Sequence, residues 1–299
     1  MNLTDHGAAR LRITLTYLWR HRRVPKLQSP TLFNELVQVR KLRDRDPRMP
    51  LLSDKVAVKS HVAEQLGREW VTPLLCSGDK LPEHFRWNSP VVVKARHGCN
   101  QNAFIRLGAH DWEAARAASA RWMRTRYGWW LDEWLYGEIP RGLLIEPFIG
   151  TVERLPLDYK IYVFGGQATH VQVHLEREHR HQWIIHDRCW RPLTSGAPLV
   201  RRPSALQAML AAAEKLAAGF DFARVDFYQP DDQPLFGEIS FYPGSGLDPF
   251  DPPALDEELG RLWLASAASV SVARLKKSAE PVLLTKPTFS SPRAARNGR

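Results

Sequence analysis

The chain has 299 residues, of which 44% are hydrophobic and 25% are charged, so it is long enough for two or three small lobes and is not a disordered polypeptide. No apolar run approaches the ~20 residues that span a bilayer, and no signal peptide is expected at the start. Three widely spaced cysteines do not predict a disulfide framework, and we expect reduced thiols in a cytoplasmic protein. The net charge of +10 suits acidic partners such as nucleotides, anionic sugars, nucleic acid or a membrane surface.

Helices are predicted in the first third of the chain. Residues 10–23 form a basic amphipathic pattern, which either packs on the main body or rests on the inner face of the membrane. A second helix is expected from Leu32 to about Leu42, with Thr31 as its N-cap. A third is expected after Ser53, with its end at Gly67.

The rest of the chain alternates strand pairs with single helices. Apolar runs on both sides of the polar turn at His97 and Gly98 predict strand, loop, strand. The further strands are expected at residues 143–148, 158–164, 168–174, 182–187, 222–228 and 235–241, and the helices at 111–127, 206–216 and 256–268. This order predicts an α+β fold with largely antiparallel sheets, and the chain contains neither a Rossmann nor a P-loop glycine motif.

Acidic side chains stand in the middle of two neighbouring strands. Asp226 shares one strand face with Arg224, and Glu238 shares the polar face of the next strand with Ser240. A short turn joins the two strands, so the four side chains are expected in one patch. A solvated sheet face is the ordinary interpretation of such alternation. However, acids are poor mid-strand residues and neighbouring carboxylates repel each other unless a cation lies between them, which favours a Mg²⁺ site.

Lysines accompany these acids in a regular order along the chain. Lys55 and Lys59 lie four residues apart, and Lys94 ends a run of three valines and opens a polar loop. A lysine that leaves a buried strand beside a loop of backbone N–H groups is typical of phosphate binding. On strand 158–164, Lys160 is expected on the polar face.

The order of these motifs resembles the ATP-grasp superfamily. The segments that carry the resemblance are DKVAVK (54–59), VVVKARHGCNQNAF (91–104), LIEPFIGTVE (144–153), ARVDFY (223–228) and GEISFYPGSG (237–246). Blocks between about residues 29 and 265 resemble most closely the TupA-like group, which is found with cell-surface polysaccharide biosynthesis. The chain departs from common patterns at Cys99 and Gln101, where Gly and Ser are frequent, and at Ser240, where ligases of the superfamily usually have Asn.

The resemblance implies two α+β lobes that hold ATP between them. It divides the chain into an N-terminal helical segment (1–50), a small lobe (51–140), a large lobe (141–268) and a basic disordered tail (269–299). For ATP, it implies phosphate, adenine and ribose contacts by Lys55, Lys94, His97, Gly98, Glu146, Phe148 and Glu153. It implies catalytic roles for Lys160 and Arg224, and Mg²⁺ ligation by Asp226 and Glu238, with Ser240 as a weaker ligand.

The acceptor is expected to lie against the loop 243–250, with contacts to Gly244 and Ser245. The His-rich stretch from His174 to Cys189 fits no common zinc spacing. We interpret it as a polar hairpin near the substrate, with Arg177 and His181 reaching an acidic small-molecule or polysaccharide acceptor.

The function implied is that of a Mg·ATP-dependent ligase, which joins a carboxylate to an amine through an acyl phosphate in cell-surface polysaccharide biosynthesis. One alternative is a kinase of the same fold that phosphorylates a sugar or lipid carrier. Another, from the charge of +10, is a non-catalytic basic protein that binds nucleic acid or a membrane surface. We expect no specific nucleic acid partner, and the sequence leaves the oligomeric state open.

Overall fold

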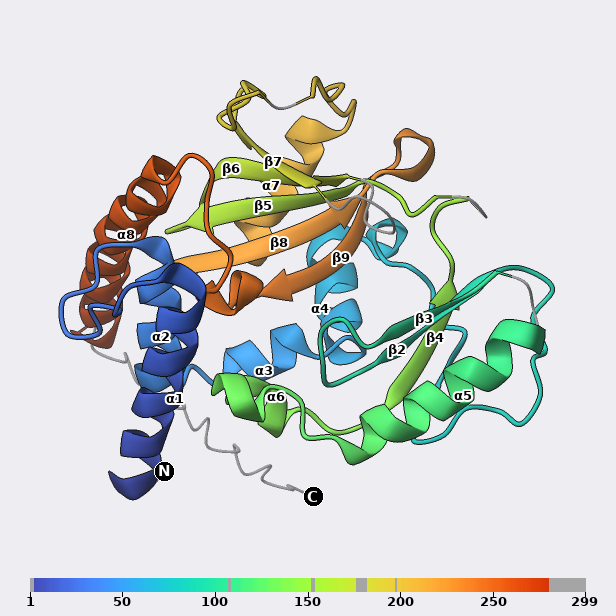
Figure 1. The fold of residues 1–299 in the computed structure, drawn as a ribbon. Coiled ribbons are helices and arrows are strands. Elements are labelled where there is room, and N and C mark those ends of the chain that lie inside the picture. The colour runs from blue at the N-terminus through green and yellow to red at the C-terminus, as the bar shows by residue number, and fades with distance from the viewer. Residues whose placement is uncertain (1–2, 107–108, 152–153, 176–181, 197, 280–299) are drawn as a thin grey trace, which may run out of the picture.

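The computed structural model describes residues 3–106, 109–151, 154–175, 182–196 and 198–279. Within these ranges the strands form two sheets in which all neighbouring strands are antiparallel, and helices flank both sheets (Figure 1). The smaller sheet has the order β1-β4-β2-β3 and consists of β1 (Cys76–Gly78), β2 (Val91–Ala95), β3 (Asn102–Ile105) and β4 (Leu143–Pro147). The larger has the order β7-β6-β5-β8-β9 and consists of β5 (Asp158–Phe164), β6 (Gln167–Leu175), β7 (Gln182–Asp187), β8 (Phe222–Tyr228) and β9 (Leu235–Ser240). The expected α+β architecture with antiparallel sheets is therefore present.

The strand β4 joins the smaller sheet, although the division made from the sequence placed residues from 141 onward in the large lobe. It pairs with β2, with Val93 opposite Ile145. Both side chains are buried in the small core around Trp112, which α5 (Ala109–Arg124) supplies. Alternation along β2 turns Val92 and Lys94 to the opposite face of the sheet.

The larger sheet is covered at one end by α2 (Phe33–Arg43) and α8 (Ala254–Ala279), and α7 (Leu206–Leu216) packs on β5, β6 and β8 (Figure 1). Phe33 of α2 is fully buried, and its ring centroid lies 5.0 Å from that of Phe222 and 5.6 Å from that of Tyr162. These aromatic residues close one end of the sheet face, while the other end, which carries Lys160 and Asp226, remains open to a cleft.

The start of α2 differs from the sequence prediction. Thr31 is not the N-cap. Leu32 holds that position, and its side chain makes no capping hydrogen bond. Instead the buried carboxylate of Glu35 reaches back and accepts hydrogen bonds from the backbone N–H groups of Thr31 and Leu32. An internal glutamate thus satisfies donors that a Ser or Thr cap usually satisfies.

The helix expected after Ser53 is α4 (Ala57–Leu66), which begins three residues later than predicted, and a helix that was not predicted, α3 (Arg48–Ser53), precedes it. Asp54 lies between the two helices, where its carboxylate accepts from the backbone N–H of Val56 at 2.9 Å and pairs with the Arg96 guanidinium at 2.6 Å. The predicted end at Gly67 is confirmed, since this residue has φ +112°, which favours glycine. The remaining α-helices of the described residues are α1 (Leu3–His21) and α6 (Leu135–Glu138). In the part of the chain that the structure describes, no helix is both long and apolar enough to cross a membrane.

Candidate functional site

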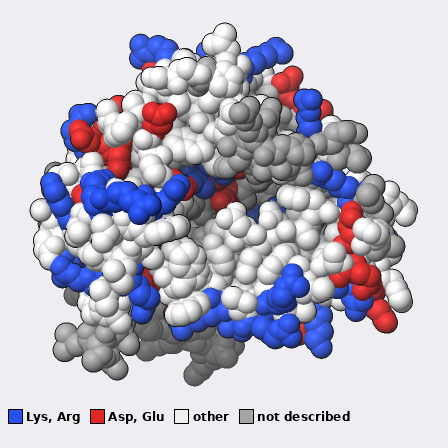
Figure 2. Space-filling view, viewed as in Figure 1, with Lys and Arg blue, Asp and Glu red and all other residues white. Residues whose placement is uncertain are grey.

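A continuous cleft runs between the two sheets. It consists of three adjoining cavities of about 50, 120 and 660 Å³, and the side chain of Asn102 lines all three. On the face drawn in Figure 2, the surface is hollowed near the centre, and acidic and basic side chains lie inside the hollow. We call the three parts the aromatic slot, the charged centre and the acceptor cavity.

The aromatic slot lies where β4 leaves the smaller sheet. Val92, Phe104, Phe148 and Tyr228 line it, and the ring centroids of Phe104 and Phe148 are 5.6 Å apart. The backbone N–H of Phe148 donates to the carbonyl of Pro90 at 3.0 Å, so this N–H is already paired. A flat aromatic ring fits between such side chains.

Glu146 pairs with Lys94, which lines both the slot and the charged centre. Its carboxylate is buried and accepts from the Lys94 ammonium at 2.6 Å and from the Lys59 ammonium. Burial opposes ionisation, but the two lysines hold the pKa of Glu146 below its ordinary value. Lys59 also donates to the carbonyl of Thr72 at 2.7 Å. Glu146 therefore fixes two cations from different elements, and Lys94 of this trio also lines the charged centre.

The loop after β2 covers the charged centre. Lys55 donates to the carbonyl of Gly98 at 2.6 Å, and a Cβ at Gly98 would lie 2.9 Å from the Tyr127 ring, so a larger residue would require this ring to shift. His97 turns away from the cleft: its Nδ1 accepts from the Gly142 N–H at 3.4 Å, and it is almost fully buried. The structure thus brings Lys55 to the cleft, pairs it with the loop at Gly98, and uses His97 to anchor the loop on the smaller lobe.

The strands β8 and β9 place the expected charged patch on the floor of the cleft. Asp226 lies opposite Glu238, and Arg224 lies opposite Ser240. Arg224 makes two hydrogen bonds to Asp226, at 2.7 and 2.8 Å, and approaches Glu238 at 3.5 Å. Lys160 on β5 donates to Asp226 at 2.5 Å.

Asp158 joins this patch from the same strand as Lys160, with an ion pair at 2.7 Å. Burial disfavours ionisation of Asp226, but the Arg224 and Lys160 charges lower its pKa below the ordinary value. The patch contains three carboxylates and two cations, and the Lys55 ammonium lies 3.8 Å from Glu238.

A Mg²⁺ ion fits the oxygen donors of this hairpin. Mg²⁺ usually takes one or two carboxylates and completes its shell with phosphate and water. Glu238 is a third exposed and has only long contacts to cations, so its oxygens can turn to a metal. No larger group of His, Cys, Asp and Glu side chains suited to a metal lies among the described residues. The donor set therefore suits an ion shared with phosphates better than an ion held by protein alone.

The acceptor cavity is closed by the loop after β9. Gly244, Ser245 and Gly246 all have positive φ, between +52° and +64°. The Lys41 ammonium donates to the carbonyl and the hydroxyl of Ser245 at 2.8 and 2.6 Å, and Gln38 donates to the same carbonyl at 2.8 Å. The Ser245 N–H donates to a carbonyl within the loop, so it is not free to bind a carboxylate. Two buried side chains of α2 therefore hold this loop in a left-handed conformation.

Sequence reasoning missed Lys41 and its partner Glu133, a buried carboxylate that hydrogen-bonds Ser245. A signal for Lys41 existed, because Asn34, Gln38 and Lys41 form a polar stripe at helical spacing and all three are buried. For Glu133 no local pattern was available. Glu153, Arg177 and His181, which the sequence assigned to ribose and acceptor, lie outside the described residues.

Comparison with known proteins gives one family match. The family model described as TupA-like ATPgrasp matches residues 35–264, well over half of the chain. None of the curated proteins matches this chain. The chain is similar to the solved structure of D-alanine–D-alanine ligase from Bacillus anthracis complexed with ATP, at 13% identity over 76% of this chain and 68% of that chain, with a TM-score of 0.48. It is also similar to D-alanine–D-alanine ligase from Helicobacter pylori, at 17% identity over 77% and 68% of the two chains, with a TM-score of 0.44. Another similar structure is an L-amino acid ligase from Bacillus licheniformis, at 17% identity over 67% of this chain and 45% of that chain, with a TM-score of 0.44.

Proposed function

This chain belongs to the TupA-like ATP-grasp family of ATP-dependent ligases, and we propose that it joins a carboxylate to an amine through an acyl phosphate. The observation that carries the proposal is the charged centre. Cations from three elements, Lys55, Lys94 and Lys160, meet the carboxylates of Asp226 and Glu238 in one cavity between an aromatic slot and a larger acceptor cavity. This is the order in which a base, a triphosphate with its metal, and an acceptor must lie.

In this proposal the adenine enters the aromatic slot beside Phe148, and Glu153 binds the ribose. Lys94 and Lys55 bind phosphate oxygens under the loop at Gly98. Glu146 orients Lys94 through their 2.6 Å ion pair, so that the ammonium does not have to be ordered when ATP arrives.

Asp226 and Glu238 would hold Mg²⁺ together with Ser240. When bound, the ion neutralises phosphate charge and aligns the terminal phosphoryl group. Arg224 and Lys160 lie on the same floor, and their buried positive charges stabilise the negative charge that develops on the phosphoryl group as it moves.

The reaction proposed has two balanced steps. An oxygen of the acceptor carboxylate attacks the terminal phosphorus of ATP, which gives an acyl phosphate and releases ADP. The nitrogen of an amine then attacks the acyl carbon, loses a proton, and expels phosphate, which leaves an amide. The loop with Gly244 and Ser245 lines the cavity in which the acceptor would be held.

We assign the acceptor to the acidic sugars of cell-surface polysaccharide or its precursors. The acceptor cavity supports this, because it contains the cations Arg224 and Lys160 and the half-exposed indole of Trp130, which is suited to a sugar ring. Arg177 and His181 are proposed to reach the same acceptor.

We further propose that the enzyme works in the cytoplasm, against the inner face of the membrane. One side of α1 packs on the body through Ala9, Ile13 and Tyr17, whereas large apolar side chains on its other side are exposed. These exposed side chains are Leu11 (61%), Leu15 (55%), Leu18 (39%) and Trp19 (68%). Exposed arginines accompany them, and an apolar stripe with basic neighbours is suited to an anionic lipid surface.

The proposed reaction is tested by release of ADP from Mg·ATP in mixtures of a sugar acid and an amine. A ligase releases ADP in a steady state only when both the sugar acid and the amine are present, and it forms an amide detectable by mass spectrometry. A phosphorylated sugar that forms without any amine would instead identify a kinase and overturn the ligase assignment.

A further inference from the structure

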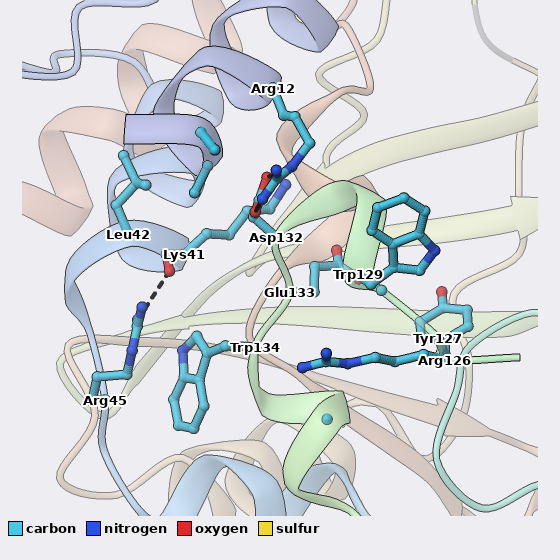
Figure 3. A pocket seen from close by; sticks show the side chains of 14 residues that line it. Arg12, Lys41, Leu42, Arg45, Arg126, Tyr127, Trp129, Asp132, Glu133 and Trp134 are labelled. Atoms are coloured by element: carbon cyan, nitrogen blue, oxygen red, sulfur yellow. Dashed lines mark hydrogen bonds and ion pairs between the residues drawn. The ribbon is translucent and has the colours of Figure 1, made fainter. Parts of the chain in front are cut away.

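A second cavity of about 330 Å³ opens outside the cleft, between α1, α2 and the segment 126–137 (Figure 3). We call it the basic aromatic pocket. The side chains that define it are Arg12, Lys41, Arg45, Arg126, Tyr127, Trp129, Asp132, Glu133 and Trp134. The proposed ligase reaction uses none of the arginines or tryptophans among them.

Positive charge exceeds negative charge in this pocket. Arg12 forms an ion pair with Asp132, and the Lys41 charge offsets the buried carboxylate of Glu133. Two exposed guanidinium groups remain. Arg45 donates only to backbone carbonyls, at 2.7 and 2.9 Å, and among the described residues no carboxylate lies within ion-pair distance of Arg45 or Arg126. The pocket therefore has two positive charges available to a ligand.

Aromatic rings lie beside these charges. The Arg45 guanidinium lies over the Trp134 ring, 5.1 Å from its centroid, and Figure 3 shows Arg126 extending toward the same indole. The Trp134 Nε1 is buried and has no hydrogen-bond partner in the described part of the chain. Arg45 and Arg126 are exposed donors beside aromatic rings, so the complementary ligand is rich in acceptor oxygens and has a face that packs on a ring.

The pocket borders the acceptor cavity. Tyr127 and Glu133 line both spaces, and Glu133 hydrogen-bonds Ser245 of the acceptor loop. On the rim between them, Trp129 lines the pocket and Trp130 lines the acceptor cavity, with exposures of 58% and 53%. A chain-like ligand that crosses this rim would place consecutive units in the two spaces.

We propose that the basic aromatic pocket is a second acceptor subsite, which binds a carboxylated sugar unit next to the unit that reacts. The proposal rests on the proposed function, and it adds that the acceptor is an oligomer. A carboxylate on the neighbouring unit meets Arg45 and Arg126, and the sugar ring packs on an indole. A bidentate guanidinium–carboxylate contact explains why arginines rather than lysines are found here.

The test is calorimetric binding without nucleotide, with trigalacturonate, galacturonate, maltotriose and inorganic phosphate as probes. The proteins are the wild type, Arg126→Ala, Arg45→Ala and, as a matched control, Arg124→Ala, which removes an exposed arginine two residues from Arg126 and outside the pocket. We expect trigalacturonate to bind more tightly than galacturonate. We expect each pocket variant to bind trigalacturonate about 10-fold more weakly, as loss of one charge-assisted contact does. The affinities for galacturonate and for Mg·ATP should be unchanged.

Equal affinity for trimer and monomer, or equal behaviour of Arg126→Ala and Arg124→Ala, would overturn the subsite. Displacement of the trimer by phosphate or maltotriose at similar concentration would also overturn it, because the pocket would then recognise charge alone or sugar alone. Failure of the proposed function is distinguishable. It appears as wild-type protein that binds no Mg·ATP, whereas failure of the subsite leaves Mg·ATP binding intact.

Discussion

Lys160 and Asp226 lie directly opposite each other on the neighbouring strands β5 and β8, and the lysine ammonium donates to the carboxylate at 2.5 Å. Arg224 donates hydrogen bonds to both oxygens of the same carboxylate. The residue proposed to hold the metal is therefore neutralised by cations until Mg·ATP arrives. In the proposed reaction, metal and phosphate would enter as a pair, and the phosphates would then pair with the cations that Asp226 releases.

Removal of Lys160 should separate metal binding from catalysis. The Lys160→Met variant is expected to bind Mg²⁺ more tightly, because Asp226 loses a competing cation. Its kcat is expected to fall by about 10² to 10³, because a charge that stabilises the moving phosphoryl group is lost. Titration of ADP release with Mg²⁺ measures both quantities, with Lys80→Met, an exposed lysine, as the control. A kcat equal to that of the control contradicts the role of Lys160.

Substitution of Ser240 should tune metal affinity in both directions. Ser240→Ala removes a hydroxyl ligand and should raise the Mg²⁺ concentration for half-maximal activity by about 2- to 10-fold. Ser240→Asn supplies an amide oxygen and should lower it. This Mg²⁺ concentration is measured for each variant by titration with Mg²⁺ at saturating ATP. An unchanged Mg²⁺ dependence in both variants would mean that Ser240 is not a ligand.

The buried Lys41 predicts a specific pH dependence of stability. Burial lowers the pKa of Lys41 from 10.5 to about 8. Between these values the unfolded chain keeps a proton that the folded chain has lost, so stability from this group rises as pH increases. Relative to Lys41→Met, the wild-type free energy of unfolding should rise by on the order of 3 kcal/mol from pH 8 to above 10.

Urea unfolding of both proteins across this range measures the difference. Parallel stability curves for the wild type and Lys41→Met would show that Lys41 keeps an ordinary pKa. The same variant should weaken binding of the acceptor, and so raise the KM for the acceptor, without changing the KM for ATP. Lys41 holds the Ser245 loop and does not contact the aromatic slot.

The exposed stripe of α1 should bind anionic lipid. The wild type is expected to co-sediment with vesicles of phosphatidylglycerol. It is not expected to co-sediment with neutral phosphatidylcholine vesicles. The double variant Leu11→Glu, Leu15→Glu should lose binding. The pair Gln28→Glu, Ser29→Glu, which adds the same charge at exposed positions nearby, should lose less. Equal loss in both pairs would show that charge alone drives the association.

Local sequence patterns predicted the parts of the site that depend on strand periodicity. The strands 158–164, 182–187 and 222–228 have the expected bounds, and alternation with a short turn was enough to bring Asp226 opposite Glu238. Contacts between distant segments were not predictable in this way. Glu146 pairs with both Lys59 and Lys94, and these ion pairs depend on where α4 lies relative to β2 and β4.

The conformation of the acceptor loop shows the same limit. Its glycines indicated a tight turn, but the buried Gln38 and Lys41 that fix it come from a helix some two hundred residues earlier. His97 is the converse case. The family resemblance implied a contact between His97 and ATP, whereas the ring of His97 accepts a hydrogen bond from the backbone N–H of Gly142.

Calorimetric titration of Mg·ATP into the wild type, Lys94→Ala and Asp226→Asn tests the central claim most directly. Glu146 keeps Lys59 as a partner in Lys94→Ala, so that variant should fold. We predict that the wild type binds Mg·ATP, that Lys94→Ala binds it about 10- to 100-fold more weakly, and that Asp226→Asn loses the dependence of ATP affinity on Mg²⁺. A wild-type protein that shows no heat of Mg·ATP binding would contradict the account.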